Sequence, residues 1–140
     1  MDELRDSSPR IVEVLASSDA CDRLRGLPGA CRVSPDELMI VGEASIAALT
    51  RAVRLADPDA VVLDVSDGWV RITLDGSESR EAFARLSELD LPETGFVQGE
   101  LARVGVRVVA EGGRIDLLVP SMLGDHVRTR LISDGEEPLG

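Results

Sequence analysis

The sequence lacks lysine, asparagine and tyrosine altogether, and it has only three aromatic residues, Trp69, Phe83 and Phe96. Without lysine the chain can neither form a Schiff base with a carbonyl substrate nor supply the lysine of a P-loop. Three aromatic side chains are too few for a platform on which nucleic-acid bases stack. His126 is the only histidine, and we expect it to be a partly exposed helical residue rather than part of a catalytic triad or a metal site.

Basic residues are also scarce relative to acidic ones. The chain has fifteen arginines and twenty-six acidic residues, which gives a net charge of −11. Such a surface repels phosphate backbones and anionic lipids, so the sequence predicts no nucleic-acid partner and no membrane partner. No apolar run is long enough for a signal peptide or a transmembrane helix, and we expect a cytoplasmic protein. In a reducing compartment Cys21 and Cys31 are expected to remain thiols rather than to pair.

Recognisable catalytic and ligand-binding motifs are missing as well. The glycine-containing stretches "GLPGACR" (26–32) and "AEGGR" (110–114) fit neither GxGxxG nor a P-loop and are typical of turns. The sequence has no GxSxG elbow and no CxxC pair, and "DGEE" (134–137) lacks the alternating ligand spacing of a calcium loop. The sequence therefore predicts no catalytic residue, no cofactor-binding residue and no metal site on this chain.

The 140 residues are 44% apolar, which is enough to bury a core. Alternation of apolar residues predicts strands over residues 31–33, 38–42, 61–65, 70–74, 102–108 and 115–119. Short turns join consecutive strands, and such turns require antiparallel neighbours. We therefore predict an α+β fold, with helices packed on one face of a mostly antiparallel sheet of hairpins.

Three helices are predicted from apolar residues at helical spacing. The first covers residues 44–56, and the other two are expected to be capped by Ser77 and Ser121. Their buried faces are predicted to be Ile46, Leu49, Val53 and Ala56; then Ala82, Phe83, Leu86 and Leu89; and finally Leu123, Val127 and Leu131. For the domain organisation we expect a partly flexible N-terminal extension (1–23), one domain (24–132) and an acidic disordered tail (133–140).

The stretch "VVLDVSDGWVRITLDG" (61–76) predicts two strands around an Asp67-Gly68 turn, because glycine tolerates the positive φ of a type I′ turn. One face of this hairpin would be apolar, and the other would carry Asp64, Ser66, Trp69 and Arg71. Two interpretations stay open. The polar face is either a solvated surface with a cross-strand Asp–Arg pair, or a protein interface, since Trp and Arg are enriched at binding hot spots.

Three stretches resemble the gamma subunit of heterotetrameric sarcosine oxidase, over about residues 24–132. They are "VSPDELMIVG" (33–42), "VVLDVSDGWVRITLDGSESREAFARL" (61–86) and "QGELARVGVRVVAEGGRIDLLVPSMLGDHVRTRL" (98–131). Their order and spacing carry the resemblance. It implies a fold like half of an aminomethyltransferase (glycine-cleavage T protein) folate-binding domain.

The resemblance also implies a function, that of a non-catalytic accessory subunit of a bacterial oxidoreductase complex. Such a complex converts sarcosine, tetrahydrofolate and O₂ to glycine, methylene-tetrahydrofolate and hydrogen peroxide. FAD, FMN, NAD and tetrahydrofolate are then held by alpha, beta and delta subunits, and the segment from Asp64 to Arg71 becomes a candidate contact surface. Two other hypotheses stay open: a stand-alone folate-binding or aminomethyl-transfer-like domain, and a regulatory module with an unknown ligand.

Overall fold

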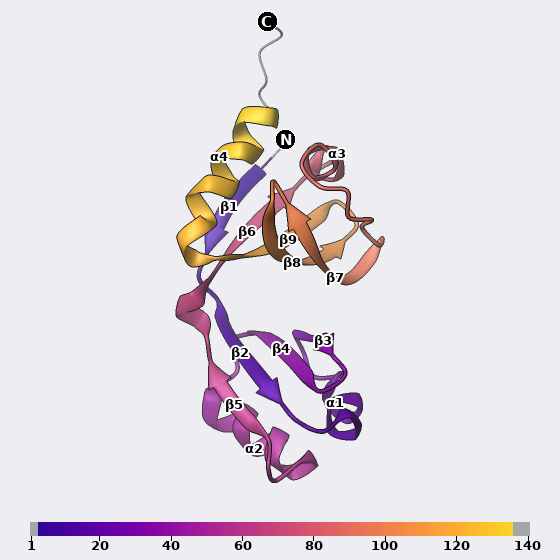
Figure 1. Cartoon of the computed structure of the whole chain (residues 1–140), viewed down its shortest axis with the longest axis vertical. Coiled ribbons are helices and arrows are strands. Elements are labelled where there is room, and N and C mark those ends of the chain that lie inside the picture. Colours follow the sequence, from indigo (N-terminus) through magenta and orange to yellow (C-terminus); the bar gives the residue numbers. More distant parts are fainter. Residues whose placement is uncertain (1–2, 136–140) are drawn as a thin grey trace, which may run out of the picture. The chain divides into compact units, whose positions relative to one another are not determined.

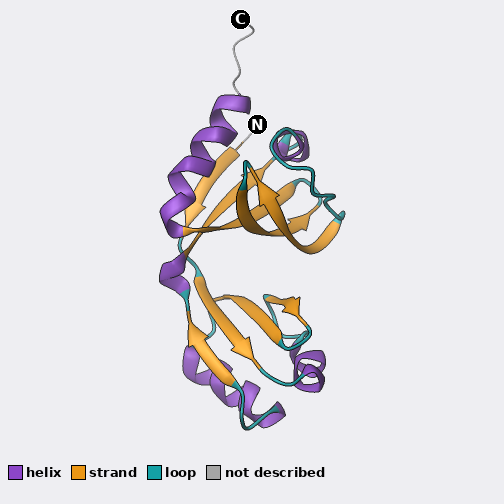
Figure 2. Cartoon of the chain, viewed as in Figure 1, coloured by secondary structure: helices purple, strands orange, loops and turns teal. Residues whose placement is uncertain are grey.

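The computed structural model describes residues 3–135, which form two compact units. We call residues 9–67 the central unit, and we call the stretches on either side of it, residues 3–8 and 68–135, the terminal unit. Each unit contains one antiparallel sheet and its own helices (Figure 1, Figure 2). The predicted α+β class and the antiparallel pairing are therefore confirmed, with the strands divided between two sheets.

The central unit has a four-stranded sheet in the order β3-β4-β2-β5, with every neighbouring pair antiparallel. Its elements are β2 (Arg10–Leu15), α1 (Ser18–Leu24), β3 (Ala30–Ser34), β4 (Glu37–Gly42), α2 (Ile46–Ala56) and β5 (Val61–Asp64). A βαββαβ chain with this strand order is a ferredoxin-like arrangement.

The terminal unit has a five-stranded sheet in the order β1-β6-β9-β8-β7. Its elements are β1 (Glu3–Ser7), β6 (Trp69–Asp75), α3 (Ser79–Ala84), β7 (Thr94–Leu101), β8 (Val104–Glu111), β9 (Arg114–Pro120), the 3₁₀ turn η2 (Ser121–Leu123) and α4 (Gly124–Gly135). The four strands β8-β9-β6-β1 have the spatial order of the central sheet, with β1 in the place of the last strand. None of the helices in residues 3–135 is long and apolar enough to cross a membrane.

Each unit has its own apolar core on the helix-bearing face of its sheet. The strands supply alternate residues to it, as the burial of β8 at every second position shows. The core of the terminal unit contains Ile72, Leu74, Phe83, Leu101, Val104, Val106, Val108, Ile115, Leu117, Val119, Val127 and Leu131. The core of the central unit contains Val12, Val14, Cys21, Leu24, Leu38, Ile40, Leu49, Val53 and Ala60.

The predicted hairpin over residues 31–42 and the first predicted helix are confirmed in the central unit. Strands β3 and β4 pair antiparallel, and α2 covers Ile46–Ala56. Ser45 caps this helix, because its side chain accepts a hydrogen bond from the Ala48 N–H at 3.1 Å. Leu49 and Val53 of the predicted stripe are buried.

The predicted hairpin over residues 61–76 is wrong, since its two strands belong to different sheets. Strand β5 pairs with β2, whereas β6 pairs with β1 and β9. Between them the chain forms a 3₁₀ turn, η1 (Ser66–Gly68), and Gly68 does not adopt the positive φ that a type I′ turn requires. The alternation identified both strands correctly, but alternation carries no information about which strand is the partner.

The C-terminal hairpin, β8 and β9, is confirmed with its turn at Gly112. Strand β7 precedes it and pairs with β8 through a two-residue turn at Ala102 and Arg103, which have φ values of 51° and 69°. Positive φ at both central residues defines a type I′ turn, which normally contains glycine or asparagine. Ala102 was expected in a strand over residues 102–108, and it lies in this turn instead, where it still packs against the core.

The last two predicted helices form, but they begin later than expected. Helix α3 begins at Ser79 with Glu78 at the N-cap position and no side-chain cap, so Ser77 is not the cap. Leu86 and Leu89 pack on the core from beyond the end of α3. Helix α4 buries Val127 and Leu131, whereas Leu123 is 37% exposed because it lies in η2, before α4 begins.

Residues 3–15 contribute one strand to each sheet, within the stretch expected to be an extension (1–23). Strand β1 pairs with β6, and β2 is an inner strand of the central sheet. The alternating residues of "RIVEVL" explain this, because Val12 and Val14 enter the core of the central unit. Helix α4 continues into the predicted tail as far as Gly135, and residues 136–140 lie outside the described residues.

Candidate functional site

The four residues predicted to share an interface face are divided between the two units. Asp64 and Ser66 belong to the central unit, whereas Trp69 and Arg71 belong to the terminal unit. The expected cross-strand pair of Asp64 with Arg71 is not formed. Asp64 instead pairs with Arg10 at 3.0 Å, and Arg71 donates from Nε to the Ser7 hydroxyl at 3.0 Å.

Asp64 and Ser66 form a structural junction at the end of β5. The Ile11 N–H donates to Ser66 Oγ at 2.8 Å, and this hydroxyl donates to Asp64 Oδ1 at 2.5 Å. The Ser66 N–H donates to the same carboxylate oxygen at 3.0 Å. These hydrogen bonds from Ser66, and then the nearby Arg10 charge, hold the pKa of Asp64 below its usual value. The pair therefore fixes the start of the connection to β6 and needs no ligand to satisfy it.

Trp69 lies at the start of β6, where its backbone pairs with Pro120. The guanidinium carbon of Arg107, on β8, lies 4.7 Å from the centroid of the Trp69 ring, which is a cation–π contact. Beside this pair is an open hollow of about 350 Å³, bordered by Gln98, Gly99, Glu100, Gly105 and Val106. A Cβ atom added at Gly105 would meet nothing within 4 Å, so the absence of a side chain there helps to leave this space empty.

The same face of the terminal sheet carries a row of polar side chains that bond to one another. Thr73 donates to Asp116 at 2.7 Å, and Arg114 lies 3.4 Å from the same carboxylate oxygen. Arg71 is engaged by Ser7 in the neighbouring strand. These contacts within the unit order the side chains of this face.

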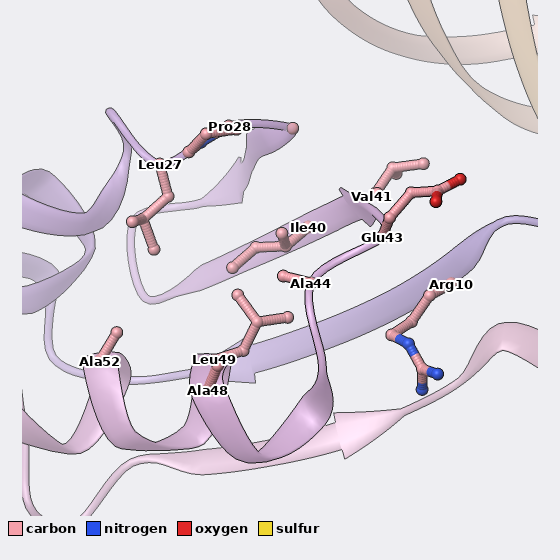
Figure 3. A pocket seen from close by; sticks show the side chains of 12 residues that line it. Arg10, Leu27, Pro28, Ile40, Val41, Glu43, Ala44, Ala48, Leu49 and Ala52 are labelled. Carbon is pink, nitrogen blue, oxygen red and sulfur yellow. The ribbon is translucent and has the colours of Figure 1, made fainter.

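The central unit has a pocket of about 300 Å³ between α2, the end of β4 and the turn at residues 27–29 (Figure 3). Its lining is apolar apart from two charged residues, and it consists of Leu27, Pro28, Gly29, Ile40, Val41, Gly42, Ala44, Ala48, Leu49 and Ala52, with Arg10 and Glu43 at the rim. Figure 3 shows the Arg10 side chain extending away from the apolar residues, and its guanidinium is held by Asp64. The pocket thus offers mainly apolar contact, with the Glu43 carboxylate at its rim.

No cluster of three or more histidine, cysteine or acidic side chains in residues 3–135 could hold a metal ion. Cys21 and Cys31 are both buried, and burial raises the pKa of the Cys21 thiol, which disfavours the reactive thiolate. His126 is exposed on α4, as expected. The polar side chains described above are engaged in hydrogen bonds within their own unit.

Arg107 and Arg10 were not identified from the sequence, although each contacts a residue that was. Alternation along β8 places Arg107 on the face opposite Val106 and Val108, and this signal is readable in the sequence. Its position beside Trp69 depends on the order β6-β9-β8, which no local pattern encodes. Arg10 meets Asp64 only because β2 and β5 are neighbours.

Comparison with solved structures shows that the fold is a known one. A chain of the heterotetrameric sarcosine oxidase from a Corynebacterium species, solved with pyrrole 2-carboxylate, has a TM-score of 0.78 at 18% identity, covering 93% of this chain and 81% of that chain. A putative C-terminal regulatory domain of aspartate kinase from Porphyromonas gingivalis has a TM-score of 0.50 at 13% identity, covering 94% of each chain. No protein-family model and no curated protein matches the sequence. This chain therefore has the fold of a chain of sarcosine oxidase, the complex whose gamma subunit the three stretches resemble.

Proposed function

We propose that this chain is the gamma-type accessory subunit of a cytoplasmic, sarcosine oxidase-like complex. The carrying observation is the likeness to a chain of heterotetrameric sarcosine oxidase, which extends over 93% of this chain. In this proposal larger alpha and beta subunits, with a delta subunit, hold FAD, FMN, NAD and tetrahydrofolate. They oxidise sarcosine with O₂ and transfer the one-carbon unit to tetrahydrofolate, while this chain provides a surface on which the larger subunits pack.

The proposed contact surface includes Trp69, Arg71 and Arg107 in the terminal unit. Trp69 and Arg107 form a preordered aromatic–cation pair beside an open hollow, and side chains of these two types dominate binding hot spots. A side chain of a partner that fills this hollow would bury the Trp69 ring without a rearrangement of the sheet. Asp64 and Ser66 act indirectly, because they fix the end of β5.

The proposal is tested by purifying a tagged chain from its own host. Larger flavin-containing chains are expected to co-purify in stoichiometric amounts, and the complex should form hydrogen peroxide from sarcosine. Trp69→Ala should weaken the assembly by about 2 kcal/mol or more, as truncation of a hot spot does. Met122→Ala, at a side chain 88% exposed in the same unit, is the matched control and should assemble normally.

The isolated chain provides a second test of the proposal. It should bind no flavin, and calorimetry with tetrahydrofolate should give no heat of binding. Stoichiometric flavin on the pure chain, tetrahydrofolate binding by it, or amine turnover without larger chains would contradict the accessory role. Binding of tetrahydrofolate alone would instead favour the stand-alone folate-binding domain.

A further inference from the structure

Strand β5 forms one edge of the central sheet, and half of its backbone groups point away from that sheet. It is the last strand in the order β3-β4-β2-β5. The Val65 N–H donates to the Ile11 carbonyl at 2.9 Å, which sets the alternation of the β2–β5 ladder. The N–H and C=O groups of Val62 and Asp64 therefore point outward, where another strand could pair with them.

The side chains around this edge are unusually apolar for a solvent-facing strand. Val61 is 45% exposed and Leu63 is 47% exposed. Leu15, which lies directly opposite Val61 in the ladder, is 43% exposed. The three side chains lie on the face opposite Val14 and Val62, which point toward the core of the central unit. Val61 and Leu63 make an aliphatic strip beside the outward backbone groups, and Leu15 adjoins this strip on β2.

Protective features that natural edge strands carry are few here. Such strands are commonly shielded by lysine, proline, a bulge or an inward-pointing charge. β5 has a regular register with β2, no proline, and one charged side chain, Asp64, which Arg10 already engages. Its short length, four residues, is the one feature that limits unspecific pairing.

The negative charges around β5 favour some pairing strands over others. Asp57 and Asp59 precede the strand, and Asp64 and Asp67 close it. An antiparallel second copy of β5 would bring Asp59 of one chain near Asp64 of the other, and each chain carries a net charge of −11. Like charges opposed across strands are destabilising, so pairing between two copies is disfavoured. A strand with basic ends complements the same edge.

We propose that β5 is a docking edge at which an extended segment of a partner protein adds a fifth strand to the central sheet. The segment has aliphatic residues at alternate positions, which cover Val61 and Leu63, and basic residues at its ends, which face the flanking aspartates. Main-chain hydrogen bonds to Val62 and Asp64 give the affinity, and the aliphatic strip and the charges give the selectivity. The docking edge itself does not depend on the proposed function. Only the identity of the partner, a larger subunit of the complex, rests on it.

The test uses the full chain and a synthetic seven-residue peptide in which valine and threonine alternate between two terminal arginines. In a ¹H–¹⁵N NMR titration the amide signals of residues 61–64 should shift, and the Val62 and Asp64 amides should exchange more slowly with solvent. Leu63→Lys, a change that edge strands tolerate, should weaken binding about tenfold, because it removes apolar contact and adds repulsion. A peptide with terminal glutamates in place of arginines should bind more weakly still.

Leu55→Lys is the matched control, since it adds the same charge at a side chain that is 85% exposed on α2. It should bind the arginine-ended peptide like the unchanged chain, apart from a small general charge effect. Equal weakening by Leu55→Lys and Leu63→Lys, equal binding of the two peptides, or unchanged exchange at Val62 and Asp64 would each overturn the docking edge. None of these outcomes bears on co-purification with flavin-containing chains, so the two proposals fail separately.

Discussion

The central and terminal units use the same order of strands with different chain connectivity. In the central unit the six elements follow one another without interruption from β2 to β5. In the terminal unit the last strand position is taken by β1, which comes from the other end of the chain, and β7 is added at the opposite edge. The comparison shows that the strand at a given place in a sheet need not be close in sequence to the strands it pairs with.

The two cores also differ in size, and this difference predicts unequal stability. The buried cluster of the terminal unit has twelve residues, including Phe83, whereas the cluster of the central unit has nine, including Cys21 and Ala60. Buried apolar area is the dominant stabilising term, at roughly 25 cal/mol per Å². The terminal unit should therefore be the more stable of the two. The only tryptophan, Trp69, belongs to it, and its fluorescence reports the terminal unit selectively.

The largest effect is expected from Gly29→Ala in the central unit. Gly29 has φ of +78°, and an added Cβ would lie 1.9 Å from the Val41 carbonyl oxygen. The turn would have to move and the Val41 N–H bond to the Gly29 carbonyl would break, at a cost on the order of 4 kcal/mol. Thermal unfolding followed by circular dichroism should then show a first transition at a lower temperature, from the central unit. The transition followed by Trp69 fluorescence should come at a higher temperature.

Gly42→Ala is the control for this change, because an added Cβ there meets nothing within 4 Å. If the terminal unit folds independently, an unfolded central unit becomes a loop between β1 and β6, and loop closure costs little more as a loop lengthens. Simultaneous loss of both signals in Gly29→Ala would show instead that the two units unfold as one.

A pair of core truncations, with effects comparable to that of Gly29→Ala or smaller, sharpens the comparison. Leu38→Ala in the central unit and Leu117→Ala in the terminal unit each empty a fully buried site. Each should lower the free energy of unfolding of its own unit by about 2–5 kcal/mol. Urea titrations followed by Trp69 fluorescence should respond to Leu117→Ala and much less to Leu38→Ala. The reverse ranking would contradict the division into two cores.

The smallest effect is expected from Asp64→Asn, and it should depend on pH. The folded-state pKa of Asp64 lies below its unfolded value, so its carboxylate stabilises the folded chain above the unfolded pKa, about 3.9. That contribution is lost as the pH falls through the folded-state pKa. Asp64→Asn should therefore lower the melting temperature of the central unit at pH 7, and the difference from the unchanged chain should shrink in acid. Asp59→Asn, at an exposed site in the same unit, is the control.

Much of the secondary structure was predictable because it depends on local patterns. The alternation of β8 and β9, the stripe on α2 and the turn at Gly112 all lie within short windows. The turn at Ala102 and Arg103 was not predictable, since neither residue favours positive φ. Nor was β1, whose apolar content is low and whose strand depends on pairing with β6.

The contact role of the candidate residues stays a prediction. Their residue types stand out in the sequence, but their grouping on one hairpin was wrong. Trp69 and Arg71 stand out in a chain poor in aromatic residues, and the structure places both on β6. Asp64 and Ser66 were grouped with them because a two-residue Asp-Gly turn is a strong hairpin signal. The hydrogen bonds that Ser66 makes to Ile11 and Asp64 stabilise η1 instead, and they involve a residue 55 positions away.

By itself the sequence determined where the chain can be extended or helical and which side of each element is apolar, because alternation and helical spacing are local properties of the polymer. It also determined that the chain has few of the side chains used in catalysis, with one histidine and no lysine. Only the tertiary structure decided which strands pair, and hence that residues 61–76 join two sheets. Pairing is a competition among all strands for backbone partners and buried area, and its outcome is a property of the whole chain.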